Sequence, residues 1–280
     1  MRFQIAAAFA AVYLIWGSTY LAIRFVIETL PPFFMAGTRF LVAGLFLYVL
    51  ARWRSNSQAS ISHWGTAFVV GGFMLLGGHG AVVLAEQWIP SGLTSLLIAT
   101  VPLWMGLIDW LRCGSKLDIK VAGGLVLGFA GVVLLIGSME MLGGSYIDII
   151  GAAIVVFGSF LWANGSLYSR SAKMPSSPFL ATAMEMIAGG LLLLLASLIT
   201  GEPGRVRLDL VSARSAIAWL YLIVFGSLIA FTSYTWLLKK TTTAKVSTYA
   251  YVNPVVAMFL GWALAGSHLQ FRTCLQPLLF

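Results

Sequence analysis

The fold of this 280-residue chain is decided by one stretch, WGSTYLAIRFVIETLPPFFMAGTRFLVAGLFL, which runs from Trp16 to Leu47 and occurs twice. A shift of 146 residues places Trp16 on Trp162 and Arg24 on Arg170. These matches carry more weight than leucine matches, because leucine recurs throughout the sequence. The other pairs are Leu21 with Leu167, Pro32 with Pro178, Phe33 with Phe179, Gly44 with Gly190, Leu45 with Leu191 and Leu47 with Leu193. A repeat of this length predicts one structural unit written twice.

The later part of each unit repeats as well, with an offset of 152 because six extra residues enter the second copy. At this offset Pro102 meets Pro254 and Trp110 meets Trp262. The repeat therefore divides the chain into two units, residues 1–145 and residues 146–280.

Composition places both units in a membrane, since 60% of the residues are hydrophobic and only 9% are charged. Soluble domains do not have such a composition. Apolar segments long enough to cross a hydrocarbon core of roughly 30 Å as helices recur almost end to end. The first is too long for a signal-peptide core, so we expect it to be retained. We expect nine spans, at about 4–23, 33–51, 64–85, 92–111, 121–138, 147–169, 179–200, 215–238 and 246–265.

The number of spans in each unit predicts how the two units are oriented. Five spans bring the chain out on the opposite side, so the second copy enters the membrane inverted. The predicted fold is an all-α polytopic membrane protein built as an inverted repeat of five-helix units, the plan of many secondary transporters. A tenth span would begin near Thr273, but only eight residues remain, whereas about 20 are needed. We therefore expect the tenth helix to be truncated.

Basic residues predict the topology. Eleven Lys and Arg residues fall on the N-terminal side of the predicted spans and five on the other side. Cytoplasmic loops carry the excess of Lys and Arg, so the N-terminus is predicted to be cytoplasmic. The same bias accounts for the net charge of +8 without nucleic-acid binding.

Two prolines at matched positions, Pro102 and Pro254, lie inside predicted spans. Proline removes a backbone hydrogen bond and clashes with the preceding helical turn. A matched pair of interrupted spans points to a transport site. A kink needed only for packing is the alternative, and proline alone does not decide between the two.

Several motifs together resemble the EamA-type branch of the drug/metabolite transporter superfamily. They are residues 16–20 (WGSTY), 85–102 (AEQWIPSGLTSLLIATVP), 162–168 (WANGSLY) and 249–254 (YAYVNP). The resemblance implies a ten-helix exporter of the bacterial inner membrane with both termini cytoplasmic. It also implies a central cavity lined by the first, third, fourth, sixth, eighth and ninth spans.

Aromatic and hydroxyl side chains inside the predicted helices are the candidate substrate contacts. Two aromatic walls and an amide suit a ligand with an apolar body and a polar head. The alternative assigns the same residues to helix packing. The candidates are Trp16, Ser18, Thr19, Thr100, Trp162, Asn164, Tyr249, Tyr251 and Asn253.

Charged and titratable residues within or at the ends of spans are candidates for gating or coupling. Arg39 and Glu185 are repeat mates, and a buried charge is costly unless it is paired. They could form a structural ion pair, or act as a gate or a substrate counter-ion. His79 and Glu86 could bind a transported proton; the alternatives are a packed histidine and a glutamate exposed at the interface.

The sequence predicts a secondary transporter that exports a small amphiphilic metabolite, such as an amino acid, with a proton as the candidate coupling ion. Efflux of organic cations held by aromatic faces is the alternative. A membrane-embedded enzyme or structural protein is a remote one, because no nucleophile, metal or cofactor motif was found. We expect a small-molecule substrate, the lipid bilayer as partner and no nucleic acid. The oligomeric state stays open.

Overall fold

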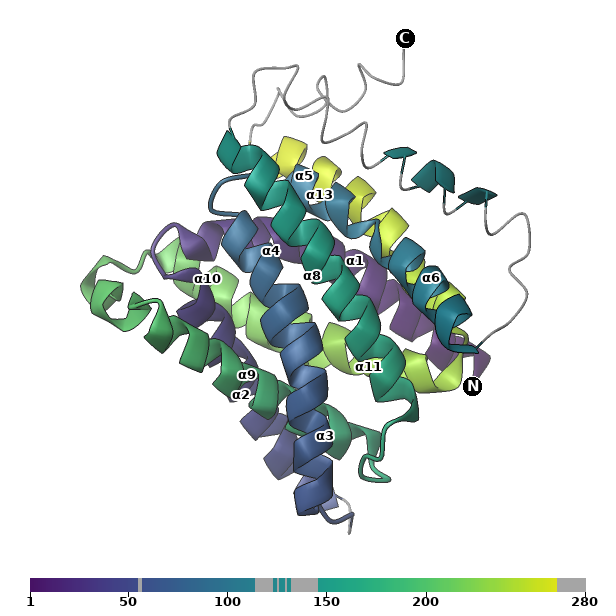
Figure 1. Ribbon diagram of the computed structural model, residues 1–280. Helices are drawn as coiled ribbons and strands as arrows, with labels where there is room; N and C mark the ends of the chain where they lie inside the picture. The colour runs from purple at the N-terminus through teal and green to yellow at the C-terminus, as the bar shows by residue number, and fades with distance from the viewer. Residues whose placement is uncertain (55–56, 114–122, 125, 129, 132–145, 266–280) are drawn as a thin grey trace.

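The computed structural model describes residues 1–54, 57–113, 123–124, 126–128, 130–131 and 146–265, and the described part is helical without a strand (Figure 1). Seven described helices, some built from consecutive elements, are long and apolar enough to cross a membrane. The elements of the first unit are α1 (Arg2–Ile27), α2 (Pro32–Arg54), α3 (Ile61–Gly71), η1 (Gly72–His79), α4 (Gly80–Ala85), α5 (Ser91–Ile98) and α6 (Val101–Cys113).

The second unit repeats this order with a longer connection after its second helix. Its elements are α8 (Tyr146–Ser171), α9 (Pro178–Ile199), η2 (Glu202–Arg205), η3 (Leu208–Leu210), α10 (Ala213–Tyr221), η4 (Leu222–Phe231), α11 (Thr232–Lys240), α12 (Thr243–Ser247) and α13 (Tyr249–Ala265). These agree with eight of the nine predicted spans. The other span, at 121–138, lies largely outside the described residues, and so does the tail where a tenth helix was considered.

Polar side chains cap the N-termini of several of these helices. They accept hydrogen bonds from backbone N–H groups of the first turn, which have no acceptor within the helix. Ser177 accepts from the N–H of Leu180 at the start of α9, where Pro178 occupies the first helical position. Glu202, far from α2 in the sequence, caps that helix: its carboxylate accepts hydrogen bonds from the backbone N–H groups of Phe33 (3.3 Å) and Phe34 (2.7 Å). The longer connection of the second unit thus caps a helix of the first.

The helices α2 and α9 are repeat mates, and they pack against each other in antiparallel orientation (Figure 1). A Cβ added at Gly37 would meet Leu194, one at Gly44 would meet Ile187, and one at Gly190 would meet Leu41. Glycine allows helix backbones to approach this closely. Since the partner number falls as the residue number rises, the helices are antiparallel, and a residue of α2 lies level with its own repeat mate only near position 42.

Two segments with the wider π-helical hydrogen-bonding pattern interrupt the third span of each unit. The segment η1 ends at His79 and η4 ends at Phe231, which is the same 152-residue offset that relates Pro102 to Pro254. Such segments are rare and frequently lie at functional sites. The third span of both units therefore departs from α-helical geometry at equivalent positions of the repeat.

The two proline-containing spans are interrupted differently. In the first unit the helix breaks at Ala99 and Thr100, just before Pro102. In the second unit the break lies at Thr248, and α13 continues through Pro254. The sequence favours interruption of the ninth span at Pro254, but α13 begins at Tyr249, five residues before this proline, and includes it.

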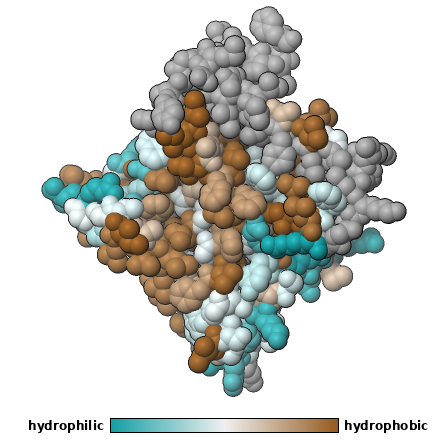
Figure 2. Space-filling model, viewed as in Figure 1, coloured by the Kyte–Doolittle hydropathy of each residue, from teal (hydrophilic) through white to brown (hydrophobic). Residues whose placement is uncertain are grey.

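The outer surface of the helices is apolar, as a lipid-facing surface must be. Figure 2 shows hydrophobic side chains over much of the visible face, with hydrophilic groups gathered towards its edges. Exposed apolar residues occur on helices of both units, among them Phe46, Leu195 and Phe225. Together with the helix lengths, this surface identifies a polytopic membrane protein.

Candidate functional site

Four aromatic rings from four helices meet at the centre of the bundle. The ring centroid of Trp16 lies 5.5 Å from that of Trp162, 4.9 Å from that of Tyr234 and 5.1 Å from that of Tyr249. The indole N–H of Trp16 donates to the carbonyl of Gly226 at 3.2 Å, and that of Trp162 donates to the Tyr234 hydroxyl at 3.0 Å. The rings are thus held by both packing and hydrogen bonds. We call these four residues the aromatic cluster.

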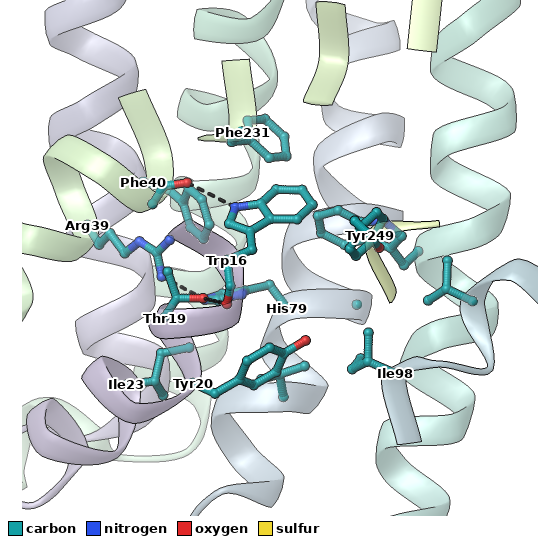
Figure 3. Close-up of a pocket in the computed structure, with 15 residues that line it drawn as sticks. Trp16, Thr19, Tyr20, Ile23, Arg39, Phe40, His79, Ile98, Phe231 and Tyr249 are labelled. Atoms are coloured by element: carbon teal, nitrogen blue, oxygen red, sulfur yellow. Dashed lines mark hydrogen bonds between the residues drawn. The ribbon is translucent and has the colours of Figure 1, made fainter. Parts of the chain in front are cut away.

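A cavity of about 60 Å³ lies beside the aromatic cluster (Figure 3). One water needs roughly 10 to 15 Å³ by the same measure, so the cavity accepts several waters or a small polar group. The second span contributes to it, in addition to those that the family resemblance implied. Its lining residues are Trp16, Thr19, Tyr20, Ile23, Arg39, Phe40, Gly78, His79, Val82, Ile98, Val101, Trp162, Gly226, Phe231 and Tyr249.

The cation in this lining is Arg39, whose side chain reaches from α2 towards Thr19 and His79 (Figure 3). Its Nε donates to the Ser227 hydroxyl at 2.9 Å, and its Nη1 lies 3.3 Å from His79 Nε2, which accepts when the imidazole is neutral. His79 belongs to η1 and Ser227 to η4. The guanidinium therefore connects the two π-helical segments.

Glu86 lies just past Ala85, the last residue of the third span, and is fully buried. Neither of its carboxyl oxygens has a hydrogen-bond partner among the described residues. Arg24 donates to its backbone carbonyl rather than to the carboxyl group. Burial raises the pKa of the Glu86 carboxyl well above its usual range, and the Arg24 guanidinium opposes that rise. The environment thus favours the protonated form.

Arg39 and Glu185 do not form the ion pair that was one of the alternatives for these repeat mates. Glu185 accepts instead from the Ser169 hydroxyl at 2.9 Å, and the structure shows no ion pair between the two repeat mates. The antiparallel crossing explains this, because it sets Arg39 level with Leu192 and Glu185 level with Phe46. Seven residues of helix separate the two levels, about 10 Å at 1.5 Å per residue.

The predicted substrate contacts divide into two groups. Trp16, Thr19, Trp162 and Tyr249 line the cavity, as do the predicted gating residues Arg39 and His79. Tyr251 lies on the other face of α13 with 54% of its surface exposed, so its assignment to the site is not supported by its position. Alternate residues of a helix point in different directions, and a spacing of two cannot place both tyrosines in one cavity.

The other four predicted contacts do not line the cavity, and their side chains bond to protein groups. Ser18 bonds to the Ile15 carbonyl (2.7 Å) and the Tyr221 hydroxyl (2.6 Å), and Thr100 to the Leu97 carbonyl (2.8 Å). Asn164 donates to the Phe160 carbonyl (2.9 Å) and accepts from Arg112 (3.0 Å). The buried Asn253 amide, turned so that its nitrogen faces acceptors, donates to the carbonyls of Tyr13 (3.0 Å) and Tyr249 (3.1 Å). These side chains support helix packing.

Sequence reasoning missed important members of the site. Tyr234 joins the aromatic cluster, and Ser227 and Gly226 surround Arg39. The repeat offered one indication, because Phe231 is the mate of His79 at the 152 offset and both line the cavity. Within the described residues there is no group of His, Cys, Asp and Glu side chains that could hold a metal ion.

Comparison with known proteins yields a family match over nearly the whole chain. The model of the EamA-like transporter family matches residues 3–137 and 149–276. A protein named as an uncharacterized inner membrane transporter, YedA of Escherichia coli strain K12, is 37% identical over 280 residues, covering 96% of this chain and 87% of YedA. The transporter YoaV of Bacillus subtilis strain 168 is 24% identical over 274 residues, covering 96% and 91% of the two chains.

More distant similarities extend to plants and to solved structures. A chloroplastic WAT1-related protein of Arabidopsis thaliana is 28% identical over 257 residues, covering 89% of this chain and 61% of that protein. A crystal structure with 21% sequence identity aligns over 95% of this chain and 90% of its own with a TM-score of 0.69. At that identity the likeness concerns the fold alone.

Proposed function

The chain belongs to the EamA-like transporter family, and we propose that it exports a small amphiphilic metabolite, such as an amino acid, from the cytoplasm by alternating access. The observation that carries the proposal is the cavity beside the aromatic cluster. It joins apolar ring faces to a few hydrogen-bonding groups, a usual design for a small-molecule site.

The repeat supports alternating access as the mechanism. Helices from both units line the cavity, and a site at the interface between inverted repeats can open to either side of the membrane. The α2–α9 crossing and the matched π-helical segments would be the places where one unit moves against the other. The bias of Lys and Arg supports a cytoplasmic N-terminus.

Glu86 supports a proton as the coupling ion. A buried carboxyl group without a hydrogen-bond donor holds a proton and releases it when water or a cation reaches it.

Efflux of an organic cation is the second candidate, favoured by the four aromatic rings, whose faces attract cations. Arg39 argues against it, because its own positive charge in the same lining repels a cation.

The test is transport by the purified full chain in proteoliposomes, loaded in turn with labelled neutral amino acids and with organic cations, with and without a pH gradient. We expect efflux of at least one amino acid above that of protein-free liposomes, and faster efflux with the gradient. Folded protein that moves no member of either panel would refute the proposed function.

A further inference from the structure

We propose that the cavity binds a carboxylate of its substrate on the guanidinium of Arg39, so that the transported metabolite is an amino acid or another organic acid and not a simple amine. This inference rests on the proposed function and specifies its substrate class.

The first argument is the missing counter-charge. Arg39 is 2% exposed, and its hydrogen-bond partners Ser227 and His79 are not anions. The ion pairs found among the described residues are Arg207 with Asp209 and Arg214 with Glu28, both at the surface. A buried charge without a partner of opposite sign is strongly unfavourable. A substrate anion would supply the charge that the described protein residues do not.

The second argument is the number of unused donors. Arginine has five N–H groups in a planar fork. The Ser227 hydroxyl accepts the hydrogen bond from Nε–H, and His79 Nε2 is the partner of one N–H of Nη1. The other three have no acceptor among the described residues, and the guanidinium lines the cavity. A carboxylate matches this fork by accepting two parallel N–H bonds.

The third argument is the space around the guanidinium. A Cβ at Gly226 would lie 2.6 Å from Arg39 Nη2 and 3.2 Å from Thr19 Cγ2, so only glycine leaves the guanidinium in place. The carbonyl of the same residue accepts the indole N–H of Trp16. A carboxylate on Arg39 would therefore lie next to the aromatic cluster, which would contact the apolar body of the substrate.

The fourth argument is that the guanidinium is held before any substrate arrives. Ser227 on η4 and His79 on η1 fix it from both units. The rings of Phe40 and His79 stack edge to face at 5.0 Å between centroids, and the Phe40 ring lies 4.7 Å from Arg39 Cζ. A site whose donors are already oriented loses less entropy on binding.

The experiment uses matched ligands that share one apolar body. The purified full chain is titrated with L-leucine, 4-methylpentanoate and 3-methylbutylamine, and separately with L-phenylalanine, 3-phenylpropanoate and 2-phenylethylamine. Binding is read from the tryptophan fluorescence, because Trp16 and Trp162 lie at the cavity. In at least one series we expect the two carboxylates to bind at least about tenfold more tightly than the amine. Equal or tighter binding of both amines, or no binding of any carboxylate, would overturn the inference.

Variants of the site give the second arm. Arg39→Gln should weaken carboxylate binding at least about tenfold and leave amine binding unchanged, whereas Arg39→Lys should retain part of the affinity because the charge remains. Gly226→Ala should also weaken it by displacing the guanidinium. Arg214→Gln, which removes a surface arginine, is the matched control. If Arg39→Gln does not fold, Arg39→Lys and Gly226→Ala decide. Unchanged carboxylate affinity in the folded variants contradicts the inference.

Binding and transport separate this inference from the proposed function. Carboxylates that bind through Arg39 but do not cross proteoliposomes would refute transport and keep the carboxylate site. Transport of amines in preference to carboxylates would keep a transporter and refute the carboxylate site.

Discussion

Two pairs of repeat mates end up in opposite situations in this protein. Trp16 and Trp162 meet with ring centroids 5.5 Å apart, whereas Arg39 and Glu185 lie on either side of the α2–α9 crossing and bond to different partners. Internal symmetry makes mates equivalent in position, but only residues near the symmetry axis touch their own mates. The rings lie there and the charges do not. Arg39 faces the cavity, and Glu185 is buried between helices.

Exchanging the two charges tests whether Arg39 and Glu185 interact, and it should have the largest effect. Arg39→Glu and Glu185→Arg each put the wrong sign into a buried place, and we expect each to lower the free energy of unfolding by about 3 kcal/mol. Because the mates do not touch, the double variant should show a coupling energy within about 0.5 kcal/mol of zero. Unfolding of the four proteins in mixed micelles by a denaturing detergent measures it. Recovery of most of the loss in the double variant would show that the mates do interact.

The ring pair offers the next largest effect. Trp162→Ala removes one wall of the aromatic cluster, and we expect transport at least tenfold weaker at near-normal abundance, a loss of roughly 1.4 kcal/mol. Trp64→Ala is the matched control, because Trp64 packs on Tyr48 and does not line the cavity. Proteoliposome flux and quantified reconstituted protein give both values. Equal losses in the two variants would assign Trp162 to packing.

Glu86 provides a contrast with Glu185, since both are buried carboxyl groups but only Glu86 has no hydrogen-bond donor. Burial raises the pKa of Glu86, so its protonated form persists to higher pH and is lost as the pH rises. We expect wild-type transport to change severalfold between about pH 5.5 and about pH 8, and Glu86→Gln, which resembles the protonated form, to lose most of that change. Flux measured at both pH values tests this. An undiminished pH dependence in Glu86→Gln would remove it as the proton site.

The smallest effect is expected on the outside of α13. Tyr251 is more than half exposed and Tyr249 is buried in the aromatic cluster, although only two residues separate them. Tyr251→Ala should change the free energy of unfolding by no more than about 0.5 kcal/mol and transport by less than twofold. Tyr249→Ala, measured in parallel, should weaken transport clearly. A large loss of transport in Tyr251→Ala but not in Tyr249→Ala would place Tyr251 in the site and Tyr249 outside it.

The repeat made much of the fold and part of the site predictable. Seven described membrane-spanning helices and the positions of Trp16, Trp162 and Tyr249 follow from apolar length and from matched aromatic residues. The partners of Arg39 did not follow, because they depend on where two helices cross. The π-helical segments could not be predicted either, because their amino-acid composition does not distinguish them from an ordinary apolar α-helix. Tyr251 was assigned to the site because it is aromatic, without regard to the direction in which its position on the helix points the side chain.

Arg39, which no described carboxylate neutralises, would make transport depend on the membrane voltage. A charge that changes depth in the bilayer does electrical work, about 2.3 kcal/mol for a full crossing per 100 mV. With a carboxylate on its guanidinium the moving part carries no net charge at that point, and without one it carries a full positive charge. For an organic acid without an ammonium group, the electric field would therefore act on the return of the empty protein and hardly on the loaded one, whereas a zwitterionic amino acid would leave one positive charge in both states.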